Sequence, residues 1–189
     1  MNKEKTVIGI TGNIGSGKGT VTEYLTQKYE AGTVAYTNIL KDILERLHLA
    51  NERKNLADLA ESLRNTFGAD ILSRVLEKDI QNKDGEIIVF DGIRKKAELD
   101  YFKNKIDNFF FVFVDVPIEI AYRRLIKRGE KTDDLTKTFA EFQKDQLRPA
   151  DKDVPGLKRY ADFVIDNSES LEKTFEQIDE MMVTIRRRG

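Results

Sequence analysis

A glycine-rich loop near the N-terminus places the strongest constraint on how this chain can fold. Gly12 is followed by four residues and then by Gly17 and Lys18, directly after the apolar run from Val7 to Ile10. The segment after the loop repeats apolar residues at helical spacing, beginning with Val21. Glycine permits the tight turn between these elements and leaves the backbone N–H groups accessible. The pattern therefore predicts a strand, a tight loop and a helix in direct succession.

A loop of this form is suited to holding phosphate groups. Its N–H groups can turn inward around phosphate oxygens, and the following helix adds unpaired N-terminal donors and the positive end of its dipole. Lys18 would reach the terminal phosphates of a nucleoside triphosphate. A plain glycine turn is the alternative interpretation. The residues predicted to bind the phosphates of ATP are Asn13, Ile14, Gly15, Ser16, Gly17, Lys18, Gly19 and Thr20.

Composition excludes several classes of partner. The 189 residues carry 32 Lys and Arg against 33 Asp and Glu, and this balance provides no basic field for nucleic acid. The chain has no cysteine, so disulfides and thiolate metal sites are excluded. No apolar run approaches the roughly 20 residues of a membrane span. We expect a cytoplasmic protein that binds neither nucleic acid nor membrane, and that is a monomer or a homodimer.

Short apolar runs alternate with longer periodic polar segments, a pattern typical of strands joined by crossover helices. It predicts an α/β fold, a P-loop NTPase three-layer sandwich with a five-stranded parallel sheet, as one domain over residues 1–189. The run from Phe109 to Val114 has no polar alternation and should be buried on both faces. Strands are expected over 6–11, 33–36, 86–91, 109–116 and 161–166. Helices are expected over 17–30, 38–49, 54–67, 70–81, 96–104, 118–128, 137–147 and 171–187.

Two helical regions are longer than simple crossovers require. Residues 37–82 are sufficient to wall an acceptor pocket between the second and third expected strands. Residues 123–158 are strongly charged and have Gly or Pro near their ends, which predicts a mobile helical lid. A solvated surface hairpin is the alternative for the second region.

A second motif ends the third expected strand. Asp91 follows the apolar run from Ile87 to Phe90, and Arg94 comes three residues later. An acid at this position can hold Mg²⁺ through water, because Mg²⁺ keeps several of its own waters. The planar guanidinium of Arg94 could bind a phosphate with two hydrogen bonds. Asp91 as the N-cap of the following helix is the alternative interpretation.

Residues 15–20 and 91–94 resemble the nucleoside monophosphate kinases among the P-loop kinases, including the glycine (Gly19) that follows the loop lysine in adenylate kinases. The resemblance implies transfer of the γ-phosphoryl group of ATP to a nucleoside or deoxynucleoside monophosphate, with Mg²⁺ held through Asp91. Residues 63–70 are similar to deoxynucleotide kinase-like proteins, in which a helix arginine faces the acceptor. By resemblance, the acceptor-binding residues are Thr37, Lys41, Arg64 and Arg94, the lid residues are Arg124, Arg128 and Arg148, and the catalytic residues are Lys18, Arg94, Arg124 and Arg128.

Residues 161–168 resemble the last strand and loop of dephospho-coenzyme A kinases, which puts Asn167 on the loop beside the donor adenine. Those kinases carry serine after the loop lysine and an acid near the second strand, where this chain has Gly19 and Asn38. Asp42 is the nearest acid that could serve an alcohol acceptor. An acceptor phosphate needs no strong base, so the missing acid favours a nucleotide acceptor. Dephospho-coenzyme A kinase remains the alternative.

A nucleotide-dependent switch or assembly ATPase is a possibility from another class. A GTP-selective Asn-Lys-x-Asp motif would follow a late strand. Residues 104–107 have these letters but precede the strand expected at Phe109, so we interpret them as coincidence. His48, the only histidine, is interpreted as structural.

Overall fold

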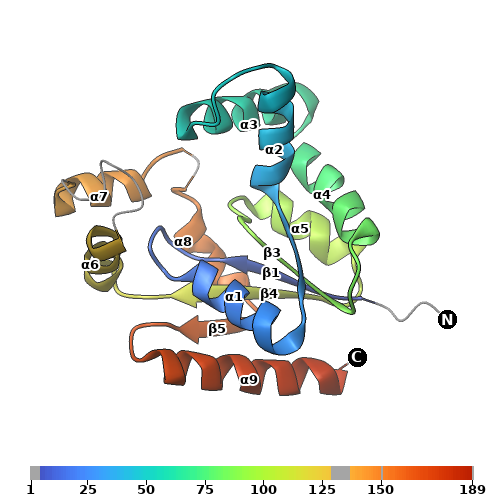
Figure 1. Cartoon of the computed structure of the whole chain (residues 1–189), viewed down its shortest axis with the longest axis vertical. Helices are drawn as coiled ribbons and strands as arrows, with labels where there is room; N and C mark the ends of the chain where they lie inside the picture. The colour runs from blue at the N-terminus through green and yellow to red at the C-terminus, as the bar shows by residue number, and fades with distance from the viewer. Residues whose placement is uncertain (1–4, 129–136, 150, 189) are drawn as a thin grey trace.

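The computed structural model describes residues 5–128, 137–149 and 151–188, without the side chains of Arg53 and Arg128 (Figure 1). In this part of the chain five parallel strands form one sheet, in the order β2-β3-β1-β4-β5. The strands are β1 (Thr6–Thr11), β2 (Gly32–Ala35), β3 (Ile87–Asp91), β4 (Phe109–Asp115) and β5 (Phe163–Asp166). The predicted α/β architecture with a five-stranded parallel sheet is confirmed.

Helices cover both faces of the sheet (Figure 1). One face packs against Val21 and Leu25 of the first helix and Ile178 of the last, and the opposite face packs against Leu76 and Phe102. The helices are α1 (Lys18–Tyr29), α2 (Tyr36–Arg46), α3 (Arg53–Phe67), α4 (Ile71–Asn82), α5 (Lys96–Lys105), α6 (Ile118–Arg128), α7 (Phe139–Gln146), α8 (Val154–Leu157) and α9 (Leu171–Arg188). The fold is therefore a three-layer sandwich.

Strand side chains alternate between two separate cores. Phe109 and Phe111 of β4 join the core under α4 and α5, whereas Phe110 and Val112 join the core under α1 and α9. All residues from Phe109 to Val114 are buried, as their uninterrupted apolar character predicted. Consecutive apolar positions are required because helices cover both faces of a parallel sheet.

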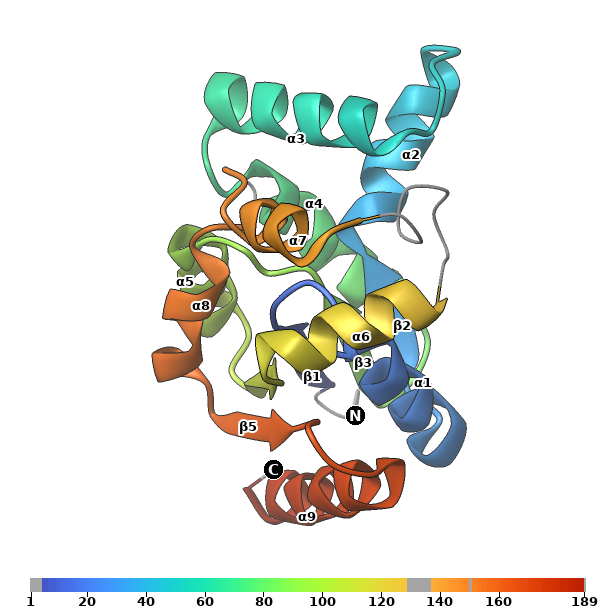
Figure 2. The ribbon, with the colours of Figure 1, turned by 90° about the vertical axis from the view of Figure 1, so that its left-hand side faces the viewer.

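The carboxyl ends of the strands point toward α6 and α7, and α2 and α3 project above the sheet (Figures 1 and 2). Parallel pairing brings the ends of all strands to the same edge. The loops that follow β1, β3, β4 and β5 therefore meet at that edge, close to the helices that the sequence assigned to the acceptor region and the lid.

Two local predictions were wrong. Tyr36 was expected to end the second strand, but it begins α2, where it is buried with its hydroxyl 3.0 Å from Ser73 Oγ of α4. The short helix α8 was not expected, although Pro155 suits a first helical turn and Val154 and Leu157 are buried. It is followed by a 3₁₀ turn (Lys158–Tyr160). Residues 129–136 and 150 of the predicted lid lie outside the described residues.

Candidate nucleotide-binding site

The loop between β1 and α1 rises from the centre of the sheet, because β1 lies between β3 and β4. At Gly12 the chain passes so close to β4 that an added Cβ would lie 2.3 Å from the carbonyl oxygen of Val114 and 2.6 Å from Ser16 Oγ. No side chain fits at this position. Only glycine lets the backbone pass this close to β4 and make the tight turn that a phosphate-binding loop requires.

Lys18 begins α1 and bends back over the same loop. Its Nζ donates hydrogen bonds to the carbonyl oxygens of Gly12 at 2.7 Å and Asn13 at 3.1 Å. The ammonium group therefore lies beside the loop, where a phosphate would compete with these carbonyl oxygens for it. The motif assigns Lys18 to the terminal phosphates of a nucleotide, and this role stays a prediction.

The segment after β3 lies directly beside the phosphate loop. Asp91 is in register with Ile10 of β1, and the N–H of Gly92 donates to the carbonyl oxygen of Ile10 at 3.2 Å. Thr11 Oγ1 adds a hydrogen bond of 2.6 Å to the carbonyl oxygen of Ile93. The two motifs, far apart in the sequence, therefore form one continuous edge.

Asp91 is half-buried at this edge and does not cap α5. The N-cap of α5 is Lys95, and its capping acceptor is Glu98, so the alternative interpretation of Asp91 as an N-cap is wrong. Among the described residues, no three His, Cys, Asp or Glu side chains are grouped as a metal site. A magnesium ion that keeps its waters and binds nucleotide phosphates needs only one protein carboxylate, so Asp91 beside the phosphate loop fits such an ion.

The predicted acceptor residues Arg64 and Arg94 are connected through Glu98, which is fully buried. Glu98 Oε1 accepts hydrogen bonds from Nε and Nη2 of Arg64, at 3.2 and 2.6 Å. Glu98 Oε2 accepts the backbone N–H groups of Arg94 and Lys95, at 2.9 and 3.2 Å. The helix α3 is thereby joined to the loop that carries Arg94.

Acids that follow α7 contact the same loop. Arg94 Nε lies 3.5 Å from Asp151 Oδ1. Lys95 Nζ donates to Asp153 Oδ2 and to the carbonyl oxygen of Pro149, both at 2.8 Å. The segment after α7 is therefore tied to the loop after β3, and Arg94 already has an anionic neighbour.

The predicted lid arginines lie at separate places. Arg124 on α6 donates from Nη1 to the carbonyl oxygen of Asn167, at 2.7 Å. Arg148 pairs with Asp145, whose other oxygen accepts from Lys137 Nζ at 2.8 Å. Arg128 ends α6, and its side chain lies outside the described part of the structure.

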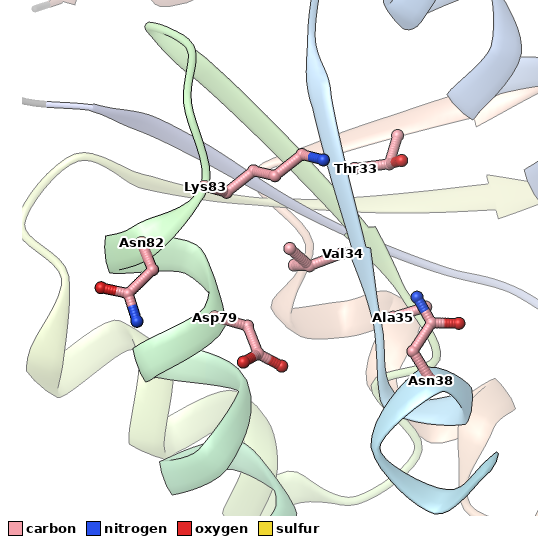
Figure 3. Close-up of a pocket in the computed structure, with 7 residues that line it drawn as sticks. All are labelled: Thr33, Val34, Ala35, Asn38, Asp79, Asn82 and Lys83. Carbon is pink, nitrogen blue, oxygen red and sulfur yellow. The ribbon is translucent and has the colours of Figure 1, made fainter. Parts of the chain in front are cut away.

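Thr37 and Lys41, the remaining acceptor candidates, lie on α2 and are exposed. An open pocket of about 290 Å³ lies beyond them, between β2 and α4 (Figure 3). Because β2 is the edge strand and β3 separates it from β1, this pocket is on the outer side of the sheet. Its lining residues are Thr33, Val34, Ala35, Asn38, Asp79, Asn82 and Lys83.

Asp42, the possible base for an alcohol acceptor, belongs to this outer side. Burial raises the pKa of Asp79, and the nearby Asp42 carboxylate raises it further. The repulsion between the two carboxylates indicates that Asp42 lies near Asp79 of α4, at the sheet edge. Nothing in its described surroundings connects it with Lys18.

Asn167, which was predicted to lie near the adenine, is buried, and its side chain contacts the phosphate loop instead of an open surface. Its Nδ2 donates to the carbonyl oxygen of Ser16 at 2.8 Å. Sequence reasoning also missed Glu98 and Asp151. Glu98 stands three residues after Lys95, which is the spacing of a capping box, but Lys95 is not a usual N-cap residue, so the sequence signal was weak. Asp151 has no local signal, because its contact with Arg94 exists only in the folded chain.

The parallel sheet, the phosphate loop and the acid after β3 define a P-loop protein of kinase-like architecture. The chain belongs to the AAA_18 family, described as an AAA domain, whose model matches residues 8–148, and to the family of UPF0200 proteins. The UPF0200 protein of Sulfurisphaera tokodaii is 30% identical over 181 residues, which cover 95% of this chain and 97% of the relative. The UPF0200 protein MJ1399 of Methanocaldococcus jannaschii is 28% identical over 181 residues, which cover 95% of this chain and 90% of the relative.

Solved structures share the fold. TT1252 from Thermus thermophilus superposes with a TM-score of 0.67 at 18% identity, covering 96% of this chain and 98% of the other. Shikimate kinase from Bacteroides thetaiotaomicron gives a TM-score of 0.62 at 16% identity, with the same coverage. At these identities the likeness concerns the fold alone. Within the described residues, no helix has the length and apolar character needed to cross a membrane.

Proposed function

We propose that the protein is an ATP-dependent phosphotransferase that moves the γ-phosphoryl group to a nucleoside or deoxynucleoside monophosphate. The observation that carries the proposal is the common edge formed by the phosphate loop with Lys18, by Asp91 and by the loop of Arg94. A polyphosphate donor, a metal-holding acid and a cation for a second phosphate are the groups that phosphoryl transfer requires.

On the donor side, the backbone N–H groups of residues 13–20 and the N-terminus of α1 would hold the phosphates of ATP. Lys18 would leave the carbonyl oxygens of Gly12 and Asn13 for the terminal phosphates, and Thr20 would contact a donor phosphate. The loop that contains Asn167 would border the adenine. The carbonyl oxygen of Asn167 accepts a hydrogen bond from the guanidinium of Arg124, so α6 lies next to this loop.

When bound, magnesium would neutralise charge on the donor phosphates. Asp91 would accept a hydrogen bond from one of the waters bound to the magnesium ion. The carboxylate is half-buried and lies one strand away from the phosphate loop, so it can do this without replacing a water on the ion.

On the acceptor side, Arg94 would hold the phosphate of the monophosphate, with Thr37, Lys41 and Arg64 around it. The acceptor is already an anion, so positioning and charge neutralisation suffice and no strong base is needed. The lack of an acid at Asn38 and the outer position of Asp42 agree with this choice. Residues 37–82 would form the acceptor region, and residues 123–158 would form a lid whose Arg124, Arg128 and Arg148 close over the transferring group.

The test is ADP formation by purified protein with ATP and Mg²⁺, against a panel of nucleoside and deoxynucleoside monophosphates and dephospho-coenzyme A. We expect at least one monophosphate to be converted to its diphosphate in this assay. We also propose that the protein carries out this reaction in the cytoplasm. Lys18→Ala should abolish turnover. Lys173→Ala is the matched control, because Lys173 is an exposed lysine on α9 that forms a surface salt bridge with Glu169.

Two outcomes would contradict the proposal. Consumption of dephospho-coenzyme A but of no monophosphate would establish the alternative acceptor. ATP hydrolysis that is indifferent to every acceptor would indicate a switch or assembly ATPase, because a kinase consumes ATP faster when its acceptor is present.

A further inference from the structure

Asn167 lies in the loop after β5, at the point where four other parts of the fold meet, and is only 2% exposed. Its side chain donates from Nδ2 to the Ser16 carbonyl oxygen at 2.8 Å and accepts at Oδ1 from Thr174 Oγ1 at 2.9 Å. Its backbone N–H donates to the carbonyl oxygen of Asp115 at 2.9 Å, and its carbonyl oxygen accepts from Arg124 at 2.7 Å. Every polar group of this residue that faces another element is therefore hydrogen-bonded.

The bond to Ser16 determines the direction of one peptide group in the phosphate loop. In a trans peptide the C=O of one residue and the N–H of the next point in opposite directions. Because the C=O of Ser16 points to the Asn167 amide, the N–H of Gly17 points away from Asn167. This N–H belongs to the residue before α1 begins, so a phosphate held by the N-terminal N–H groups of α1 would meet it on the side away from Asn167.

Gly17 shows how closely this contact is fitted. Its φ is +93°, and a Cβ at this position would lie 2.1 Å from the Nδ2 atom of Asn167. The glycine before the loop lysine is therefore required by the approach of the asparagine as well as by the turn of the backbone. The phosphate loop and the loop after β5, about 150 residues apart in the sequence, therefore pack closely together at this contact.

We propose that Asn167 is a positioning residue for the donor: its side-chain amide orients the Ser16–Gly17 peptide so that the Gly17 N–H can bind a donor phosphate. This inference rests on the donor half of the proposed function, that is, on ATP binding at the phosphate loop, and does not depend on the acceptor. The hydrogen bond from Arg124 to the same residue connects α6 with the loop.

Isothermal titration calorimetry with Mg·ATP and with inorganic tripolyphosphate tests the proposal without any acceptor. Asn167→Ala removes the amide. Asn167→Asp keeps the shape and the acceptor for Thr174 but removes the donor to Ser16, and it provides a second variant if the alanine variant does not fold. Gln177→Leu is the matched control, because Gln177 of α9 anchors the preceding residue, Asp166, by two backbone hydrogen bonds at 2.8 and 2.9 Å without touching the phosphate loop.

For both Asn167 variants we expect the dissociation constants of Mg·ATP and tripolyphosphate to rise by about tenfold or more, since hydrogen bonds to charged groups are the strong ones. Gln177→Leu should lower the melting temperature while leaving both constants within about twofold. The proposal is overturned if the Asn167 variants bind both ligands as the wild type does, or if Gln177→Leu weakens binding equally. If the wild type binds ATP but phosphorylates no acceptor, the proposed function fails and this inference does not.

Discussion

Arg64 and Glu98 form an ion pair that joins α3 to the start of α5. The side chain of Glu98 is fully buried, and that of Arg64 is 21% exposed. One carboxylate oxygen of Glu98 binds the guanidinium, and the other binds the backbone N–H groups of Arg94 and Lys95. The pair therefore supports the loop of Arg94, and we expect its loss to affect both stability and acceptor binding.

Glu98→Gln should lower the free energy of unfolding by roughly 2–4 kcal/mol, because Arg64 loses its charged partner in a buried setting. Urea unfolding followed by circular dichroism measures this change. The matched control is Asp100→Asn on the same helix, whose pair with Lys96 is exposed and should contribute under about 1 kcal/mol. If both substitutions lower the free energy of unfolding by the same amount, the buried pair of Glu98 and Arg64 stabilises the fold no more than an exposed pair does.

Arg64 and Glu98 should act on the acceptor as one unit. If Arg64 works by holding Glu98, the acceptor KM of Arg64→Ala combined with Glu98→Ala should be close to that of either single variant. Steady-state kinetics of the two single variants and the double variant measure the coupling. Additive increases in KM would instead mean that Arg64 acts on the acceptor site independently of Glu98.

Asp151 lies 3.5 Å from Arg94 and is only 12% exposed. An acceptor phosphate that binds Arg94 must compete with this carboxylate. Asp151→Asn should therefore lower the acceptor KM by up to about fivefold, the scale expected for a weak ion pair. Asp153→Asn, which removes the neighbouring carboxylate bound by Lys95 Nζ, is the comparison variant. A higher KM for Asp151→Asn would show that Asp151 supports the acceptor site.

Asp179 on α9 accepts hydrogen bonds from three residues of α1: Tyr24 at 3.0 Å, Tyr29 at 2.7 Å and Lys28 at 2.7 Å. Burial opposes its charge, but the hydrogen bonds from Lys28 and the tyrosines outweigh burial and hold the pKa of Asp179 below its ordinary value of 3.8. Burial and the bond to Asp179 raise the pKa of Tyr29 from 10.0 to about 12.

The signs of these shifts set the pH dependence of the contact between α1 and α9. A lowered carboxyl pKa stabilises the fold above about pH 4, and this contribution is lost as the pH falls through the folded pKa. The raised pKa of Tyr29 stabilises the fold below pH 10.0 and is lost as the pH rises through about 12. Asp179→Asn should therefore lower the urea midpoint near neutral pH, and the difference from wild type should shrink below about pH 4. Glu180→Gln, a change at an exposed position on the same helix, should alter neither the urea midpoint nor its pH dependence. If the midpoints of Asp179→Asn and the wild type differ by the same amount at all pH values, the ionised carboxylate is not the cause.

Asp91→Asn tests the metal assignment. If Asp91 holds a water of the magnesium ion, the substitution should raise the Mg²⁺ concentration needed for half-maximal turnover by about tenfold, the scale reported for residues that support metal ligands indirectly. Titration of Mg²⁺ at fixed ATP measures this change, and ATP binding in the presence of a chelator should be unaltered. An unchanged magnesium requirement would remove Asp91 from the metal site.

Much of the architecture could be predicted because it depends on local patterns. The apolar run of β4 indicated burial on both faces, and the glycine spacing around Lys18 indicated a loop between a strand and a helix. Parallel pairing predicted that Asp91 lies at the same edge of the sheet as the phosphate loop, but that β3 is the direct neighbour of β1 is seen only in the structure. Tyr36 was misassigned because a tyrosine fits either a strand end or a helix start, and only its packing against Ser73 decides between them.

The partners of the charged side chains could not be predicted. Arg64 and Arg94 were recognised as cations that could meet a phosphate, but their carboxylate partners come from distant elements, whereas Arg148 pairs with Asp145 only three residues before it. Long charged side chains reach many neighbours, and the sequence does not say which acid the fold brings near. Asn167 illustrates the same limit, since its amide could have faced solvent or a base.

The amino-acid sequence alone determined the order of the strands and of every helix except α8, the burial of the central strands and the location of the phosphate loop, because each depends on residues close together in the chain. The tertiary structure alone decided that Glu98 joins Arg64 to the loop of Arg94, and that Asn167 orients the peptide before Gly17. Those relationships arise from contacts between distant segments, whose geometry is set by how the helices pack on the sheet.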